Sequence, residues 1–118
     1  MAVPQLGERI LVLRPNWLEL IISGEKTLEI RGRNLCAGKY WLGCRGRIDG
    51  RAVFEPAFQI QSAATWHSLR HQHRVETDEL PYKTTFGIPV RFCERVSPPI
   101  SYTIKRGAVG IVKYAPTV

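Results

Sequence analysis

The sequence predicts an α+β fold in which a small mixed β-sheet of five or six strands curves into a barrel and is accompanied by two short helices. Short apolar or alternating segments recur along the chain and are separated by glycines and prolines, which is typical of strands and turns. Only two segments show helical spacing. The length of 118 residues fits one domain, 1–118, and its 44% hydrophobic and 23% charged content is typical of a folded chain.

The first two elements are a strand and a helix. Residues 9–13 (Arg-Ile-Leu-Val-Leu) form a branched apolar run that is typical of a buried strand and is ended by Pro15. Residues 17–22 place their apolar side chains on one helical face. We expect Asn16 to cap this helix and Gly24 to end it in the left-handed conformation.

Residues 27–31 alternate polar and apolar side chains, which predicts a half-buried strand. Successive side chains of a strand point to opposite faces, so Leu28 and Ile30 share a buried face. The other face carries Thr27, Glu29 and Arg31, which we expect to point into one common cleft.

Two further strands are predicted in the middle of the chain. Residues 39–44 form one strand, and a glycine-rich turn around Asp49-Gly50 follows it. Residues 51–63 form the next strand, in which Pro56 marks an edge or a bulge.

The last third contains the second helix and the closing strands. Residues 65–74 are predicted to form a short helix, and residues 85–95 a long strand interrupted at Pro89. We expect Pro98-Pro99 to break the chain and residues 108–112 to form a last strand.

The charge balance favours a polyanionic partner. Seventeen Lys and Arg residues face ten acidic residues, which gives a net charge of +7 spread over both halves of the chain. The apolar runs are far shorter than the roughly 20 residues that span a bilayer, so we expect no membrane association. No apolar leader precedes residue 9, and three cysteines are too few for a disulfide scaffold, which predicts a reduced, cytoplasmic protein.

Histidines and cysteines are the candidate metal ligands. His67 and His71 have helical i, i+4 spacing, and His73 lies close to them in the sequence. No Cys-x-x-Cys pair is present, and the cysteines lie far from the histidines in the sequence. We therefore expect a polar helix face rather than a zinc site, and no cofactor.

The segment after the first helix resembles the signature of the ASCH family, Gly-x-Lys-x-x-Glu-x-Arg. All of its positions are filled, by Gly24, Lys26, Glu29 and Arg31. Four C-terminal segments are also similar to ASCH proteins: 80–82 (Leu-Pro-Tyr), 85–86 (Thr-Phe), 98–102 and 106–109 (Arg-Gly-Ala-Val). The resemblance implies a PUA-like barrel with a central cleft that recognises RNA or a modified nucleotide.

The chemistry of the motif suits such a ligand. A carboxylate accepts hydrogen bonds from the amino groups of bases, and a guanidinium donates in a fixed fork. We expect the cleft to be lined by Lys26, Thr27, Glu29 and Arg31, and the ligand backbone to be held by Arg33, Arg45 and Arg47. The alternative for Glu29 and Arg31 is a weak ion pair on a solvated strand face.

Three other functions stay open. One ASCH branch hydrolyses the N4-acetyl group of acetylated cytidine with the pattern Lys-x-x-Thr-x-Arg, in which Lys is the base and Thr the nucleophile. Glu29 occupies that Thr position here, and Thr27 lies two positions earlier. An amidohydrolase would then use Lys26 and Glu29 as catalytic residues. A ribonuclease would use Lys26, Arg31 and a histidine, and a protein-interaction adaptor would bind a protein partner instead.

Overall fold

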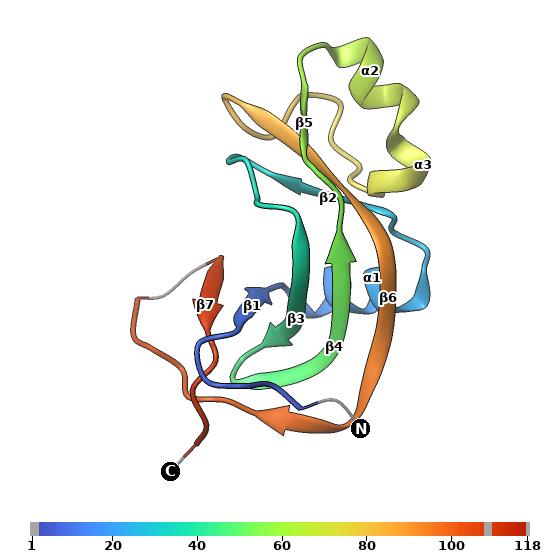
Figure 1. Cartoon of the computed structure of the whole chain (residues 1–118). Coiled ribbons are helices and arrows are strands. Elements are labelled where there is room, and N and C mark those ends of the chain that lie inside the picture. The colour runs from blue at the N-terminus through green and yellow to red at the C-terminus, as the bar shows by residue number, and fades with distance from the viewer. Residues whose placement is uncertain (1–2, 108–109, 118) are drawn as a thin grey trace.

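A mixed, strongly curved β-sheet organises the chain, whose computed structural model describes residues 3–107 and 110–117 (Figure 1). The strands are β1 (Arg9–Val12), β2 (Leu28–Arg31), β3 (Gly38–Cys44), β4 (Arg47–Phe54), β5 (Phe58–Ile60), β6 (Thr85–Ser101) and β7 (Ile111–Lys113). The helices are α1 (Pro15–Ser23), α2 (Ala63–Ser68) and α3 (Arg70–His73).

The strand order shows why the sheet is a half-barrel rather than a closed barrel. It runs β2-β6-β4-β3-β1-β7, with β5 paired to β6 beside this path. The β1–β3 pair is parallel, and the other pairs are antiparallel. Within the described residues, β2 and β7 stand at opposite ends of the path and do not pair, which leaves a seam. The predicted α+β class and mixed, barrel-like sheet are confirmed.

Helix α1 begins differently from the prediction. Arg14 is the N-cap residue and makes no side-chain capping bond, while Pro15 takes the first helical position. Asn16 therefore lies inside the first turn, because proline is pre-organised for the helix start and needs no partner for a missing N–H. The predicted end is confirmed: Gly24 has a φ of 86° and its N–H donates to Ile21 O.

The predicted turn at Asp49-Gly50 is wrong. The hairpin between β3 and β4 turns at Arg45-Gly46, whose φ values of 52° and 81° suit a two-residue loop that matches the strand twist. Gly50 lies within β4, where a Cβ would come 2.8 Å from Ile22 Cδ1 of α1. Glycine there lets the helix pack closely on the sheet.

A predicted strand and a predicted helix in the middle of the chain are each divided into two elements. Residues 51–63, predicted as one strand, split at Pro56 into the end of β4 and β5. The single helix predicted over 65–74 is two short helices that meet at Leu69, so the described residues form three helices instead of two.

Strand β6 is the longest element and continues through its prolines, contrary to the predicted interruption and break. Pro89 lies opposite Leu28, and its carbonyl accepts from the Glu55 N–H. Pro98-Pro99 fall where the register with β4 shifts, between Arg95 and Ile100, so the ladder requires no N–H from them. Of the predicted closing strand, residues 108–109 lie outside the described residues, and β7 begins at residue 111.

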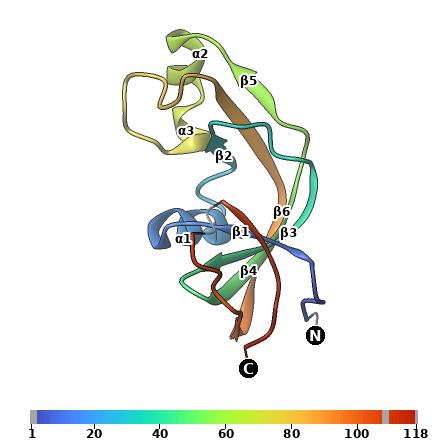
Figure 2. The same cartoon turned by 90° about the vertical axis from the view of Figure 1, so that its left-hand side faces the viewer.

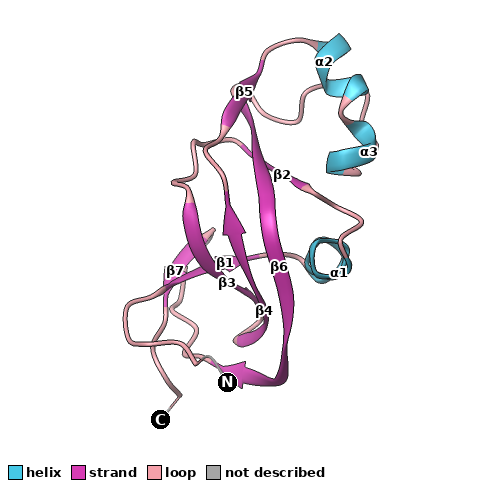
Figure 3. Ribbon diagram, turned by 45° about the vertical axis from the view of Figure 1, so that its right-hand side comes forward, coloured by secondary structure: helices cyan, strands magenta, loops and turns pink. Residues whose placement is uncertain are grey.

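Helices α1 and α2 pack into two separate apolar clusters. Leu18 and Ile21 of α1 pack with Leu11, Leu42 and Phe54 of the sheet. A separate cluster joins Leu28, Ile30, Ile60 and Trp66. Figure 3 shows α1 and α3 on the same side of the sheet, with the chain that enters β2 running between them. No helix in the described part of the chain is long and apolar enough to cross a membrane.

Candidate functional site: a cleft at the seam of the half-barrel

A cavity of about 330 Å³ opens at the seam, between the β1–α1 junction on one side and β2 on the other. In Figure 2 the β1–α1 junction lies below β2 and the α3 region. The cavity is lined by Val12, Leu13, Arg14, Trp17, Lys26, Glu29, Ile30, Arg31, Val75, Pro81 and Tyr82. We call it the seam cleft. It brings together the lysine, glutamate and arginine of the sequence motif.

Lys26 is the most constrained of the three. The residue is only 2% exposed, and its Nζ donates to His73 O at 2.5 Å. The same nitrogen lies 3.8 Å from Glu29 Oε1 and 4.6 Å from the centre of the Trp17 ring. Burial lowers the Lys26 pKa from 10.5 to about 8, with the Glu29 carboxylate opposing this shift and Arg31 adding to it. The ammonium is therefore still mostly charged at neutral pH.

Glu29 lies between two cations. It is 4% exposed, and its Oε2 accepts from Arg31 Nε at 2.8 Å while Lys26 lies on the Oε1 side. Arg31 Nη2 donates to Val12 O at 3.2 Å, which carries the guanidinium across the seam. The weak ion pair on a solvated face that was the alternative interpretation is inconsistent with this burial. The carboxylate keeps free lone pairs on Oε1 for a ligand.

The alternation predicted for β2 is confirmed in part. Leu28 and Ile30 are buried in one cluster with Trp66, and Glu29 and Arg31 line the cleft, although Ile30 also reaches the cleft lining. Thr27 does not join them: it precedes β2, is exposed, and does not line the cleft. Its backbone is fixed by bonds to Gln72 O and Val90 N, so the alternating face begins only at residue 28.

The three arginines expected to hold a ligand backbone lie elsewhere. Arg33 is exposed beyond the end of β2 and does not line the cleft. Arg45 and Arg47 line a different cavity of about 340 Å³, where Arg47 Nε donates to Asp49. The excess of positive charge did not predict their positions. The β3–β4 hairpin carries Arg45 and Arg47 away from β2.

Sequence reasoning missed much of the cleft wall. Arg14 and Trp17 come from the β1–α1 junction, and Val75, Pro81 and Tyr82 from the loop after α3. The Leu-Pro-Tyr segment carries a family resemblance, and Trp17 belongs to an apolar helix face and to the segment that resembles the family, but neither signal predicts a place in the cleft. The His73 carbonyl left no signal at all, because a backbone acceptor does not depend on residue type.

Histidines and cysteines do not gather. Across residues 3–107 and 110–117, no group of three His, Cys, Asp or Glu side chains is arranged to hold a metal ion. His67 Nε2 bonds to Asp78 O, and His73 is buried against Trp66. None of the three histidines lines the seam cleft.

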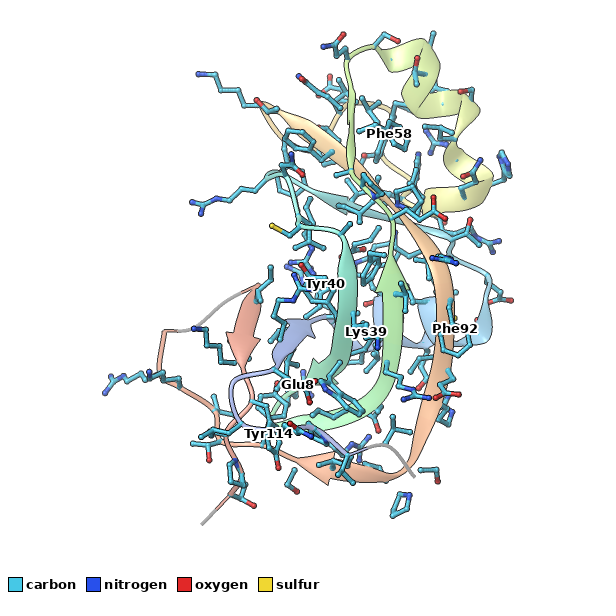
Figure 4. All side chains as sticks on the ribbon, in the orientation of Figure 1. Glu8, Lys39, Tyr40, Phe58, Phe92 and Tyr114 are labelled. Carbon is cyan, nitrogen blue, oxygen red and sulfur yellow. The ribbon has the colours of Figure 1, made fainter. Side chains whose placement is uncertain are left out.

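A larger cavity of about 680 Å³ lies on the other side of the sheet. It is lined in part by Glu8, Lys39 and Phe92, which lie on the side that faces the viewer in Figure 4, with α1 behind the sheet. No residue of the sequence motif reaches it. The seam cleft, which holds the buried carboxylate and its cations, is therefore the candidate site.

Comparisons with known proteins identify the fold. No family model and no curated protein matches the chain. Three crystal structures of the ASCH protein from Zymomonas mobilis do match, each at 16% identity. One substituted form gives a TM-score of 0.73 over 96% of this chain and 92% of that chain. The unsubstituted protein gives 0.72 over 92% and 88%. A second substituted form gives 0.72 over 92% and 91%. The chain therefore has the fold of this ASCH protein, as the motif implied.

Proposed function

We propose that this ASCH-fold protein binds single-stranded RNA by holding one nucleobase in the seam cleft. The observation that carries the proposal is the buried Glu29 carboxylate, flanked on one side by Lys26 and on the other by Arg31. Burial makes each of these charges costly unless it is satisfied, and such groups cluster at binding sites.

The three charged groups complement the edge of a base. A Glu29 oxygen accepts from an exocyclic amino group, while Lys26 and Arg31 donate to the ring nitrogen or carbonyl oxygen beside it. Lys26 Nζ and Glu29 Oε1 lie 3.8 Å apart, which brings a donor and an acceptor to the same edge of one base. This arrangement favours bases that carry an amino group.

The residues that line the cleft suit a stacked nucleobase and a neighbouring phosphate of the strand. Tyr82 is 47% exposed and Trp17 also lines the cleft, so both offer aromatic surface for stacking. A volume of about 330 Å³ is at the lower end for ligand pockets and fits one nucleoside. Arg14 lines the cleft and is exposed, where it reaches a phosphate, and the net charge of +7 draws the strand to the protein.

Hydrolysis of a modified base, such as N4-acetylcytidine, is the second candidate. The Lys26 pKa of about 8 favours it, since a general base works best when its pKa is near the working pH. Among the described residues, however, the cleft lining contains no serine, threonine or cysteine, and Tyr82 is its only hydroxyl. Thr27 does not supply the missing nucleophile. A hydrolase here would need Lys26 and Glu29 to activate water.

The remaining alternatives have less support. A ribonuclease that uses Lys26, Arg31 and a histidine lacks its histidine, because all three histidines are described and none lines the cleft. A polar, buried site of this kind does not support a protein-interaction adaptor.

The test is a titration of labelled single-stranded RNA of mixed sequence with wild type, Glu29→Gln and Glu55→Gln. Both substitutions remove one negative charge, and Glu55 is exposed outside the cleft. A purely electrostatic binder would bind more tightly in both variants. Base recognition requires Glu29→Gln to bind about 5- to 150-fold more weakly, the usual value of a bidentate base contact, while Glu55→Gln does not weaken binding. Equal behaviour of the two variants would contradict the proposal.

A further inference from the structure

We infer that His73 is a positioning residue for the seam cleft. Its neutral imidazole, protonated on Nε2, holds the backbone of residues 73–75, which accepts a hydrogen bond from Lys26 and includes Val75 of the cleft lining. The inference rests on the proposed function, since it concerns the same cleft. His73 does not itself line the cleft and acts through its neighbours.

The hydrogen bonds of the ring fix its protonation. The Val75 N–H donates to His73 Nδ1 at 2.9 Å, so Nδ1 carries no proton. The proton therefore sits on Nε2, which donates to Trp66 O at 2.9 Å. The ring also stacks on Trp66, with centres 3.8 Å apart and planes 14° from parallel. The residue is fully buried, and both ring nitrogens are used.

Two cleft residues depend on this arrangement. The carbonyl of His73 accepts from Lys26 Nζ, and the next residue but one, Val75, lines the cleft. The neighbouring Gln72 carbonyl accepts from Thr27 N–H, which ties α3 to the chain entering β2. The ring thus anchors residues 73–75, which contribute to the cleft through the bond from Lys26 to the His73 carbonyl and through Val75 in the lining.

Protonation of the ring would break the arrangement. A proton on Nδ1 would face the Val75 N–H, so two donors would meet and the bond would be lost. The titratable and charged groups facing the ring are Lys26, from the segment entering β2, and Arg70 and His71 on α3. Burial lowers the His73 pKa below 6.5; the bond to Trp66 opposes this shift, and these three groups add to it. The neutral form is therefore the one that persists at neutral pH.

The matched variants are His73→Asn and His71→Asn. Asparagine at position 73 places an amide oxygen near the position of Nδ1, where it accepts from Val75 N–H and does not titrate. His71 is exposed on the same helix, so its replacement is a control for the loss of one histidine. Unfolding curves establish that each variant is folded before binding is measured.

The binding experiment uses a mixed-sequence single-stranded RNA with a pH-insensitive fluorescent label, from about pH 8 down to the lowest pH at which unfolding curves show the variants folded. Below the His73 pKa, uptake of one proton on the ring weakens wild-type binding about tenfold for each pH unit. We expect His71→Asn to keep this acid limb and His73→Asn to lose it. An unchanged acid limb in His73→Asn would overturn the inference.

Ring ¹⁵N chemical shifts of wild type, without any RNA, supply an independent readout. They are expected to show Nε2–H and bare Nδ1 for His73 at neutral pH, and the opposite tautomer would overturn the inference. If that tautomer is found but no RNA binds at any pH, the proposed function fails and the positioning role of His73 stands. If RNA binds but the acid limb does not depend on His73, only the positioning role fails.

Discussion

Arg31 Nη2 donates to Val12 O at 3.2 Å, and this bond joins β2 to β1 across the seam of the half-barrel. The same guanidinium donates through Nε to Glu29. One side chain thus connects the two edges of the cleft and orients its carboxylate, which gives the arginine of the motif a structural as well as a recognition role.

Replacing Arg31 with lysine keeps the charge but removes the planar fork that serves Glu29 and Val12 together. We expect RNA binding to weaken by about 1–3 kcal/mol and the free energy of unfolding to fall by about 1–2 kcal/mol. Titration and urea denaturation measure the two effects. Arg33→Lys, at an exposed position outside the cleft, is the control and is expected to change neither.

Lys26→Met removes a buried charge and makes stability depend differently on pH. The folded Lys26 pKa is about 8, below its ordinary 10.5, so the unfolded chain binds more protons between these values. The free energy of unfolding of wild type therefore rises from pH 8 toward 10.5, recovering about 3 kcal/mol that burial costs below pH 8.

In Lys26→Met this rise disappears, while RNA binding is lost because no ammonium remains in the cleft. Urea denaturation across that pH range, with the exposed Lys39→Met as the control, measures the difference between variants. A rise of equal size in wild type and Lys26→Met would show that Lys26 titrates normally.

The salt dependence of RNA binding reports the phosphates contacted. A cleft and rim that contact about three to five phosphates give a slope of log affinity against log salt of roughly −2 to −3.5 on a single strand. Arg14→Ala is expected to reduce the slope, because it removes an exposed cation from the rim. Binding that does not change with salt would contradict a role for the positive charge.

Incubation with N4-acetylcytidine separates binding from catalysis. We expect no release of cytidine above background by chromatography, because Glu29 occupies the position of the hydrolase threonine and Thr27 is outside the cleft. Multiple turnovers that vanish in Lys26→Ala would reverse the order of the two proposed functions and make Glu29 the group that activates water.

Much of the local structure could be predicted because it depends on neighbouring residues. The alternation through residues 28–31 fixes which side chains of β2 share a face, and Gly24 ends α1 for a reason that needs only its own backbone. Predictions failed where two local signals competed, as at Arg45-Gly46 and Asp49-Gly50. Both are suitable turn pairs, and only the pairing of β3 with β4 decided between them.

The sequence by itself determined the motif, the strand that carries it and the excess of positive charge. The tertiary structure alone decided that Lys26 is buried, that the His73 carbonyl accepts from the Lys26 ammonium, and that Trp17 and Tyr82 line the cleft. The reason is the strand order: β2 and the β1–α1 junction face each other across the seam cleft only because the sheet curves and brings these distant parts of the path together. Such contacts depend on pairings between distant segments, which no local pattern of residues records.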